Sequence, residues 1–81
     1  MNFQPLDVVV LKTDLPAQGL KQGDLGAVVD LYGPDAIAVE FVTASGRTKA
    51  LITLKSSDVR EVGDDDLVAV RPTGASPRRD A

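Results

Sequence analysis

The stretch that decides the fold is AIAVEFVTASGRTKALITL, residues 36–54. In its first part every second residue is apolar, which places those side chains on one side of an extended chain. Residues 43–46, Thr-Ala-Ser-Gly, are a short connection ending in glycine, typical of a β-hairpin. Residues 47–54 then return as the partner strand. The stretch therefore predicts two antiparallel strands, with Ile37, Val39 and Phe41 on the core side.

Two further strands are predicted before this hairpin. Residues 6–11, Leu-Asp-Val-Val-Val-Leu, are rich in β-branched side chains and nearly continuous, as in a strand covered on much of both faces. Residues 23–26 form a turn into a second strand at 27–32. Gly26 either lets a neighbouring strand approach closely or makes a bulge. Residues 33–35, Gly-Pro-Asp, end this strand because proline cannot donate a ladder hydrogen bond.

The segment between the first two strands predicts a long irregular loop. Residues 12–22 contain proline and glycine and do not alternate, and Gly19 permits a positive φ. Leu20 is an apolar residue that we expect beneath this loop. After the hairpin, residues 55–58 favour a single 3₁₀ turn, and residues 59–62 alternate as a short closing strand.

Five strands without a helix-length periodic segment predict an all-β domain, either a small barrel or two orthogonal sheets. A long loop, then short turns, then a 3₁₀ turn before the last strand is the element order of SH3-like barrels. We therefore expect a small five-stranded SH3-like barrel over residues 1–62. Its predicted core consists of Val8, Val10, Val28, Ile37, Val39, Phe41, Leu51 and Val59.

The composition changes at residue 63. Residues 63–66 read as an acidic linker, in which Asp64, Asp65 and Asp66 form a solvated charge run. They lack the spaced ligand pattern of a calcium loop. Residues 67–70, Leu-Val-Ala-Val, either add a short extra C-terminal strand or remain irregular, and the pattern leaves both open. Residues 71–81 read as a flexible C-terminal tail.

The absence of two residue types limits the chemistry that the chain can perform. The 81 residues contain no cysteine and no histidine, which excludes disulfides, thiolate zinc sites and the usual general base near neutral pH. The serines fall in predicted turns or in the tail, where local backbone hydrogen bonds account for them. We therefore expect no catalytic residues, no cofactor and no metal, and a protein that is not an enzyme.

Charge and hydropathy bear on partners and location. The net charge is −3 and there are three aromatic residues, which disfavours both phosphate binding and base stacking by the chain. No apolar run approaches the roughly 20 residues of a membrane span. The N-terminal residues lack the features of a signal peptide. We expect a cytoplasmic protein with no membrane association and no nucleic-acid partner.

Several segments together resemble a bacterial family catalogued as domain of unknown function 4926. They are residues 7–16, 19–29, 39–42, 46–48 and 50–54. The resemblance covers residues 7–62 and implies a small, often stand-alone SH3-like barrel without catalytic residues. Members of the family are thought of as small partners of neighbouring toxin-like or enzyme-like proteins. Residues 19–29 also resemble the ribosomal KOW element and the barrel of nitrile hydratase β-subunits.

These observations predict a non-catalytic protein-interaction module that binds one protein partner, encoded nearby if the family resemblance holds. Loops on a rigid scaffold commonly carry function. Three alternatives stay open: an antitoxin or immunity protein, a KOW-like RNA- or ribosome-associated barrel, and a homo-oligomeric structural barrel that associates through a strand edge. The candidate partner contacts are Leu15, Leu20, Tyr32, Arg47 and Lys49.

Overall fold

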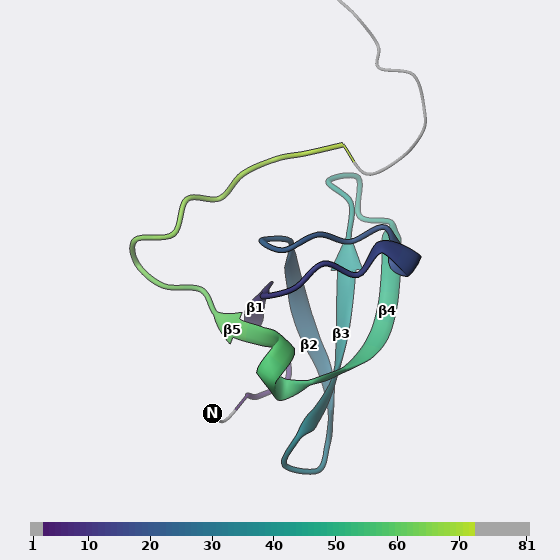
Figure 1. The fold of residues 1–81 in the computed structure, drawn as a ribbon, viewed down its shortest axis with the longest axis vertical. Coiled ribbons are helices and arrows are strands. Elements are labelled where there is room, and N and C mark those ends of the chain that lie inside the picture. The colour runs from purple at the N-terminus through teal and green to yellow at the C-terminus, as the bar shows by residue number, and fades with distance from the viewer. Residues whose placement is uncertain (1–2, 73–81) are drawn as a thin grey trace, which may run out of the picture.

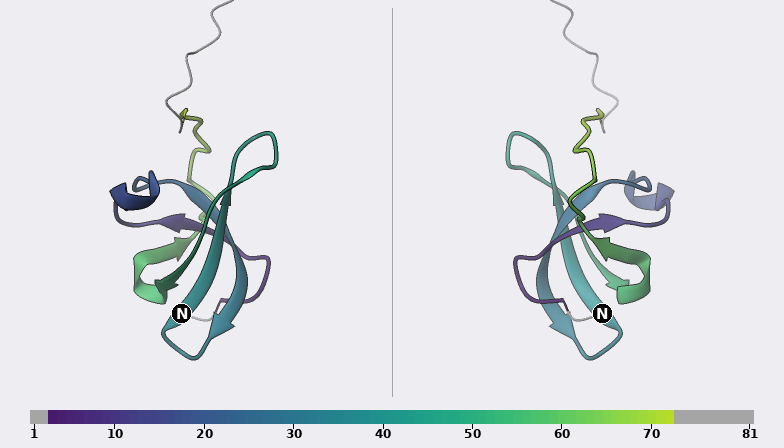
Figure 2. Two further views of the ribbon diagram at one scale, coloured as in Figure 1. Left: turned by 90° about the vertical axis from the view of Figure 1, so that its right-hand side faces the viewer. Right: turned by 90° about the vertical axis from the view of Figure 1, so that its left-hand side faces the viewer.

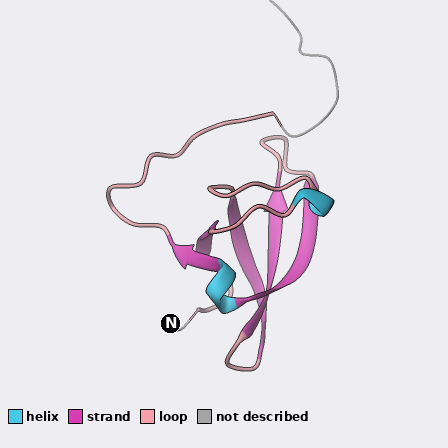
Figure 3. Ribbon diagram, in the orientation of Figure 1, coloured by secondary structure: helices cyan, strands magenta, loops and turns pink. Residues whose placement is uncertain are grey.

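The computed structural model describes residues 3–72 of the chain. Within them the fold consists of five β-strands and two single-turn 3₁₀ helices (Figures 1 and 3). The strands are β1 (Val8–Leu11), β2 (Leu25–Tyr32), β3 (Ala36–Val42), β4 (Thr48–Lys55) and β5 (Val59–Glu61). The 3₁₀ turns are η1 (Pro16–Gln18) in the long loop and η2 (Ser56–Asp58) before the last strand.

The strands form one antiparallel sheet in the order β4-β3-β2-β1-β5. The predicted all-β class and the five strands are confirmed. The sheet curls strongly (Figure 2), helped by register shifts between Val28 and Asp30 in β2 and between Phe41 and Val42 in β3. Within residues 3–72 it does not close into a barrel, because β4 and β5 each pair on one side only and form its two edges.

One hydrophobic cluster lies inside the curl of the sheet. Six of the eight predicted core residues are buried, but Val8 is 51% exposed and Leu51 is 60% exposed. The other three residues of β1 are buried: Val9 and Leu11 are fully buried, and Val10 is 7% exposed. A run of four apolar residues has no alternation from which to read the inward phase. The cluster consists of Phe3, Val9, Leu11, Leu20, Val28, Ile37, Val39, Phe41, Leu54 and Val59.

Gly26 lies where β2 faces the core. A Cβ atom at this position would come within 2.5 Å of Val39 Cγ1 and 2.9 Å of Phe41 Cε2. Real Cβ atoms essentially never approach so closely, so any larger residue would push β3 side chains out of place. The predicted role of Gly26 in close packing is confirmed, and the bulge of β2 lies elsewhere, at Val29.

The chain after β5 contains no further strand within the described residues. Residues 67–70 are irregular, so the extra C-terminal strand left open by the sequence is not formed there. Residues 63–72 instead form a separate segment that leaves β5, bows away from the sheet and ends near the β3–β4 hairpin, and we call this segment the strap (Figure 1). Of the predicted tail, residues 73–81 lie outside the described residues. Among residues 3–72, no helix is long and apolar enough to cross a membrane.

Candidate functional site

The long loop between β1 and β2 is an ordered structure. Leu15 and Leu20 form an isolated β-bridge in which each backbone N–H donates to the other's carbonyl, at 2.9 and 3.1 Å. The 3₁₀ turn η1 lies between them, and Gly19 ends it with a φ of +71°. This geometry turns Leu20 inward, where it is buried in the core. Leu15 is half-buried and packs against the same cluster.

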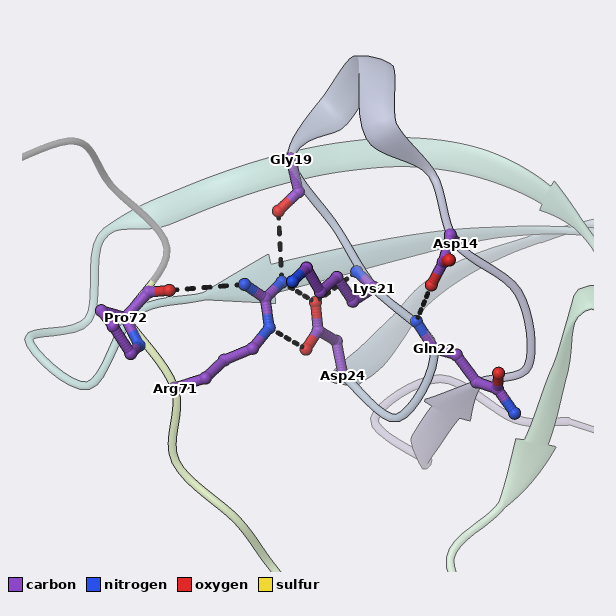
Figure 4. A network of polar contacts seen from close by, with 7 residues as sticks. All are labelled: Asp14, Gly19, Lys21, Gln22, Asp24, Arg71 and Pro72. Atoms are coloured by element: carbon purple, nitrogen blue, oxygen red, sulfur yellow. Dashed lines mark hydrogen bonds and ion pairs between the residues drawn. The ribbon is translucent and has the colours of Figure 1, made fainter.

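Asp24, at the end of this loop, collects several hydrogen bonds (Figure 4). Its carboxylate accepts the backbone N–H of Lys21 at 2.8 Å, which stabilises the turn that leads into β2. It also accepts the guanidinium of Arg71, whose Nε donates to Oδ1 at 2.8 Å and whose Nη2 donates to Oδ2. Arg71 Nη2 further donates to the Gly19 carbonyl at 3.2 Å. The hydrogen bonds from Arg71 hold the pKa of Asp24 below its ordinary value, against the opposing effect of burial.

A second arginine–aspartate pair fixes the start of the strap. Arg60 in β5 donates from Nη1 and Nη2 to the two carboxylate oxygens of Asp66, at 2.8 and 2.9 Å. Asp66 also accepts the backbone N–H of Gly63 at 2.6 Å, closing a turn. These donors, Arg60 first, lower the pKa of Asp66 to about 2. Asp66 is thus a structural residue, so the solvated charge run predicted for residues 64–66 describes only Asp64 and Asp65.

Between these two anchors the strap exposes its apolar side chains. Leu67 and Val70 are 94% and 95% exposed, and Val68 is 73% exposed. Such nearly complete exposure of neighbouring aliphatic side chains is unusual on a small domain, where continuous apolar surface commonly marks an interaction site. Figures 1 and 2 show the strap standing away from the sheet between its ends.

A groove of about 490 Å³ lies between the strap, the end of the long loop and the β3–β4 hairpin. Its walls are mainly apolar, and Lys49 is the exposed cation among them. The other charged residues of the lining, Asp24 and Arg71, pair with each other. We call this cavity the strap groove. Its lining includes Leu20, Leu25, Phe41, Val42, Lys49 and Val68.

The comparison with protein families identifies the domain beneath the strap. A family model described as domain of unknown function (DUF4926) matches residues 6–61. The chain belongs to this family. The match begins just before β1 and ends with β5, so the sheet is the family's domain and the strap lies beyond the matched residues. No curated protein and no solved structure matches the chain.

The fold of this DUF4926 domain brings together only some of the predicted contact residues. Lys49 lines the strap groove, with its side chain beside Gly19. Leu20 lines the same groove but is 3% exposed, so its assignment as a partner contact is wrong: it is a core residue. Leu15 also serves mainly in packing.

Tyr32 and Arg47 lie apart from the strap groove. Tyr32 is exposed at the end of β2, and the β2–β3 hairpin that follows lies at the opposite end of the sheet from the β3–β4 hairpin (Figure 1). Arg47 is exposed in the hairpin loop before β4, so it does not lie on a strand face together with Lys49. Glu40 accepts a hydrogen bond from Thr48 Oγ1 at 2.6 Å, and within residues 3–72 it forms no ion pair with Arg47 or Lys49.

The strap and its anchors were missed from the sequence. Asp24 and Arg71 are 47 positions apart, and nothing in the spacing of charges connects them. A local signal existed for Asp66, because Gly63-Asp-Asp-Asp66 is a turn sequence in which an aspartate can bond back to the chain. Residues 3–72 contain no group of three or more acidic side chains placed to hold a metal ion.

Proposed function

We propose that this protein is a non-catalytic protein-interaction module of a bacterial cytoplasm, which binds one protein partner in the strap groove. The observation that carries the proposal is the groove itself, a mainly apolar cavity at the junction of three segments with Lys49, which has no ion pair among residues 3–72, in its wall. Clefts lined by apolar side chains with a few placed polar groups are the usual form of a binding site.

The lining defines the kind of partner segment that fits. Leu25 and Val42 offer exposed apolar contact, and burying apolar side chains against them is favourable. The ammonium group of Lys49 has no ion-pair partner among residues 3–72. A partner segment with an apolar side chain next to a carboxylate satisfies both features, since the carboxylate pairs with Lys49.

The composition supports binding over catalysis and over nucleic-acid recognition. Without histidine or cysteine, the chain lacks the residues that most often move protons or attack substrates. Two of its three aromatic rings, Phe3 and Phe41, are buried, which leaves Tyr32 as the exposed ring. Base stacking on a single ring and a net negative charge give little basis for RNA binding.

The experiment compares two exposed valines that differ in position only. Val42 lines the groove and is 55% exposed, whereas Val8 lies on β1 outside it and is 51% exposed. Tagged full-length protein and the variants Val42→Asp and Val8→Asp are used to capture proteins from cells of the source organism. We expect a partner that binds the wild type and Val8→Asp and is lost with Val42→Asp, while circular dichroism shows all three folded.

Two outcomes contradict the proposal. Equal recovery of the partner with Val42→Asp and Val8→Asp places the binding surface elsewhere. Recovery that depends on RNA, and disappears after nuclease treatment, assigns the protein to a ribosome- or RNA-associated class instead.

A further inference from the structure

The strap carries a strand-like segment without a partner strand. Within residues 3–72, no backbone N–H or C=O of residues 67–70 takes part in a hydrogen bond. Leu67, Val68 and Val70 are apolar and highly exposed, and two of them are β-branched. Free backbone groups beside such side chains are what an added β-strand needs.

The sheet also has an acceptor for such a strand. β4 is an edge of the sheet and is eight residues long, and among the described residues 3–72 it pairs only with β3. Exposed strand edges are templates for pairing with another chain. β5, the other edge, is three residues long and offers little to pair with. Leu51 projects from β4 with 60% of its surface exposed, which adds apolar area beside the edge.

Charge complements this pairing. The exposed residues Asp64 and Asp65 precede the apolar segment, and Lys55 is exposed at the end of β4. In an antiparallel arrangement, like every other pairing in this sheet, Asp65 opposite Lys55 aligns residues 67–70 with residues 53–50. The acidic start of the strap then faces the lysine, and apolar residues face the apolar and threonine positions of β4.

We propose that the strap of one copy adds as an antiparallel strand to β4 of a second copy, and that the exchange is reciprocal. One chain holds both the strand and the edge, which are complementary in apolarity and charge, and the edge is long enough to pair with the whole segment. Two copies related by a two-fold axis therefore form the same contact twice, which is the usual way a symmetric dimer closes. This inference is independent of the proposed function.

The two anchors prepare the strap for this role. Asp66 is held by Arg60 at one end and Arg71 is held by Asp24 at the other, so the apolar segment is presented between two fixed points. Fixing a segment in advance lowers the entropy that binding must remove. While both pairs are formed, the strap makes no hydrogen bond to its own β4 within the described residues.

Sedimentation equilibrium of the full 81-residue chain tests the proposal, with two variants of one strap residue. Ala69→Pro removes a backbone donor that residues 3–72 of a single copy do not use and that lies opposite Leu51, whose backbone groups point to the free edge of β4, whereas Ala69→Val keeps the donor. We expect a reversible dimer for the wild type and Ala69→Val, and at least a tenfold weaker dimer for Ala69→Pro. A wild type that stays monomeric at every concentration overturns the proposal, as does an equally tight Ala69→Pro dimer.

A charge exchange tests the register without relying on proline. Asp65→Lys or Lys55→Glu alone should weaken the dimer, and the two together in one chain should restore it. Failure of the double variant to recover dimerisation contradicts the proposed alignment. Hydrogen exchange supplies the direct readout: amides in residues 67–70 should become protected as the protein concentration rises. A dimer in which they exchange as fast as in the monomer is held by another surface.

Discussion

The guanidinium of Arg71 donates hydrogen bonds from Nε and Nη2 to the carboxylate of Asp24, although the two residues are 47 positions apart in the chain. Their side chains are only 30% and 18% exposed, so the pair is shielded from water on much of its surface. Bidentate arginine–carboxylate pairs are the stronger class of ion pair and fix geometry as well as energy. This contact joins the end of the strap to the long loop, and it defines one wall of the strap groove.

Removal of the Arg71 guanidinium should release the end of the strap from the long loop while the sheet stays folded. We expect Arg71→Gln to raise the rate of limited proteolysis within residues 63–72 by about fivefold, which corresponds to about 1 kcal/mol for a partly shielded pair. The matched control is Arg47→Gln, since Arg47 is exposed and has no ion pair among residues 3–72. Equal cleavage rates in the two variants would show that Arg71 does not hold the strap.

Acid should release the start of the strap over a defined range. The pKa of Asp66 is lowered from 3.8 to about 2 by Arg60 and the Gly63 amide. A carboxyl group whose pKa is lower in the folded state contributes stability that is complete above its unfolded value and is lost as the pH falls through its folded value. The contribution of Asp66 should therefore be complete above about pH 4 and decline toward pH 2.

The measurement for this prediction is the NMR titration of the Asp66 carboxyl carbon together with the Gly63 amide shift. Both should follow the same midpoint near pH 2, because they report one hydrogen bond. In Asp66→Asn the Gly63 amide should lose this transition. A Gly63 amide that titrates in the variant as in the wild type would assign the transition to another group.

Most of the fold could be predicted from the sequence because its signals are local. The alternation of residues 36–42 and the glycine-ended turn predicted β3 and the hairpin, and the expected bounds of β3 agree with the structure. The 3₁₀ turn at Ser56–Asp58 also lies within its predicted range. Sheet closure depends on whether two distant edges meet, and no local pattern encodes that, which is why the expected barrel is an open, curled sheet.

The site was harder to predict than the fold. Leu20 was predicted to lie beneath the long loop, and it is buried there. Because it is buried, it cannot also be a contact for a partner. Lys49 was found as an exposed cation, but its groove depends on the strap, which packs there through Asp24 and Arg71. An ion pair between two distant residues, such as Arg71 and Asp24, produces no periodic pattern in the sequence. Sequence patterns therefore could not place Arg71 in the site.

Adjacent valines in β1 allow a direct test of which face is the core. Val9 is fully buried and Val8 is 51% exposed, although the two are identical residues in one strand. Val9→Ala should lower the free energy of unfolding by about 2 kcal/mol, through lost apolar burial and the cavity left behind. Val8→Ala should lower it by less than about 1 kcal/mol. Urea denaturation measures both losses of unfolding free energy. A larger loss for Val8→Ala than for Val9→Ala would place Val8 in the core, as the sequence predicted.

Gly26 provides the sharpest test of the packing between β2 and β3. The added methyl group of Gly26→Ala would lie 2.5 Å from Val39 Cγ1 and 2.9 Å from Phe41 Cε2, both in the core. Relief of this overlap requires core side chains to leave their positions, which costs about 1–3 kcal/mol of stability. Gly63→Ala is the matched control, because a Cβ there would meet only Asp66 Oδ2 at an ordinary 3.5 Å. Urea denaturation should therefore show a marked loss of stability for Gly26→Ala and little change for Gly63→Ala. If both variants are equally stable, β2 and β3 have more room between them than the structure gives, and the core would have to be packed differently around Val39.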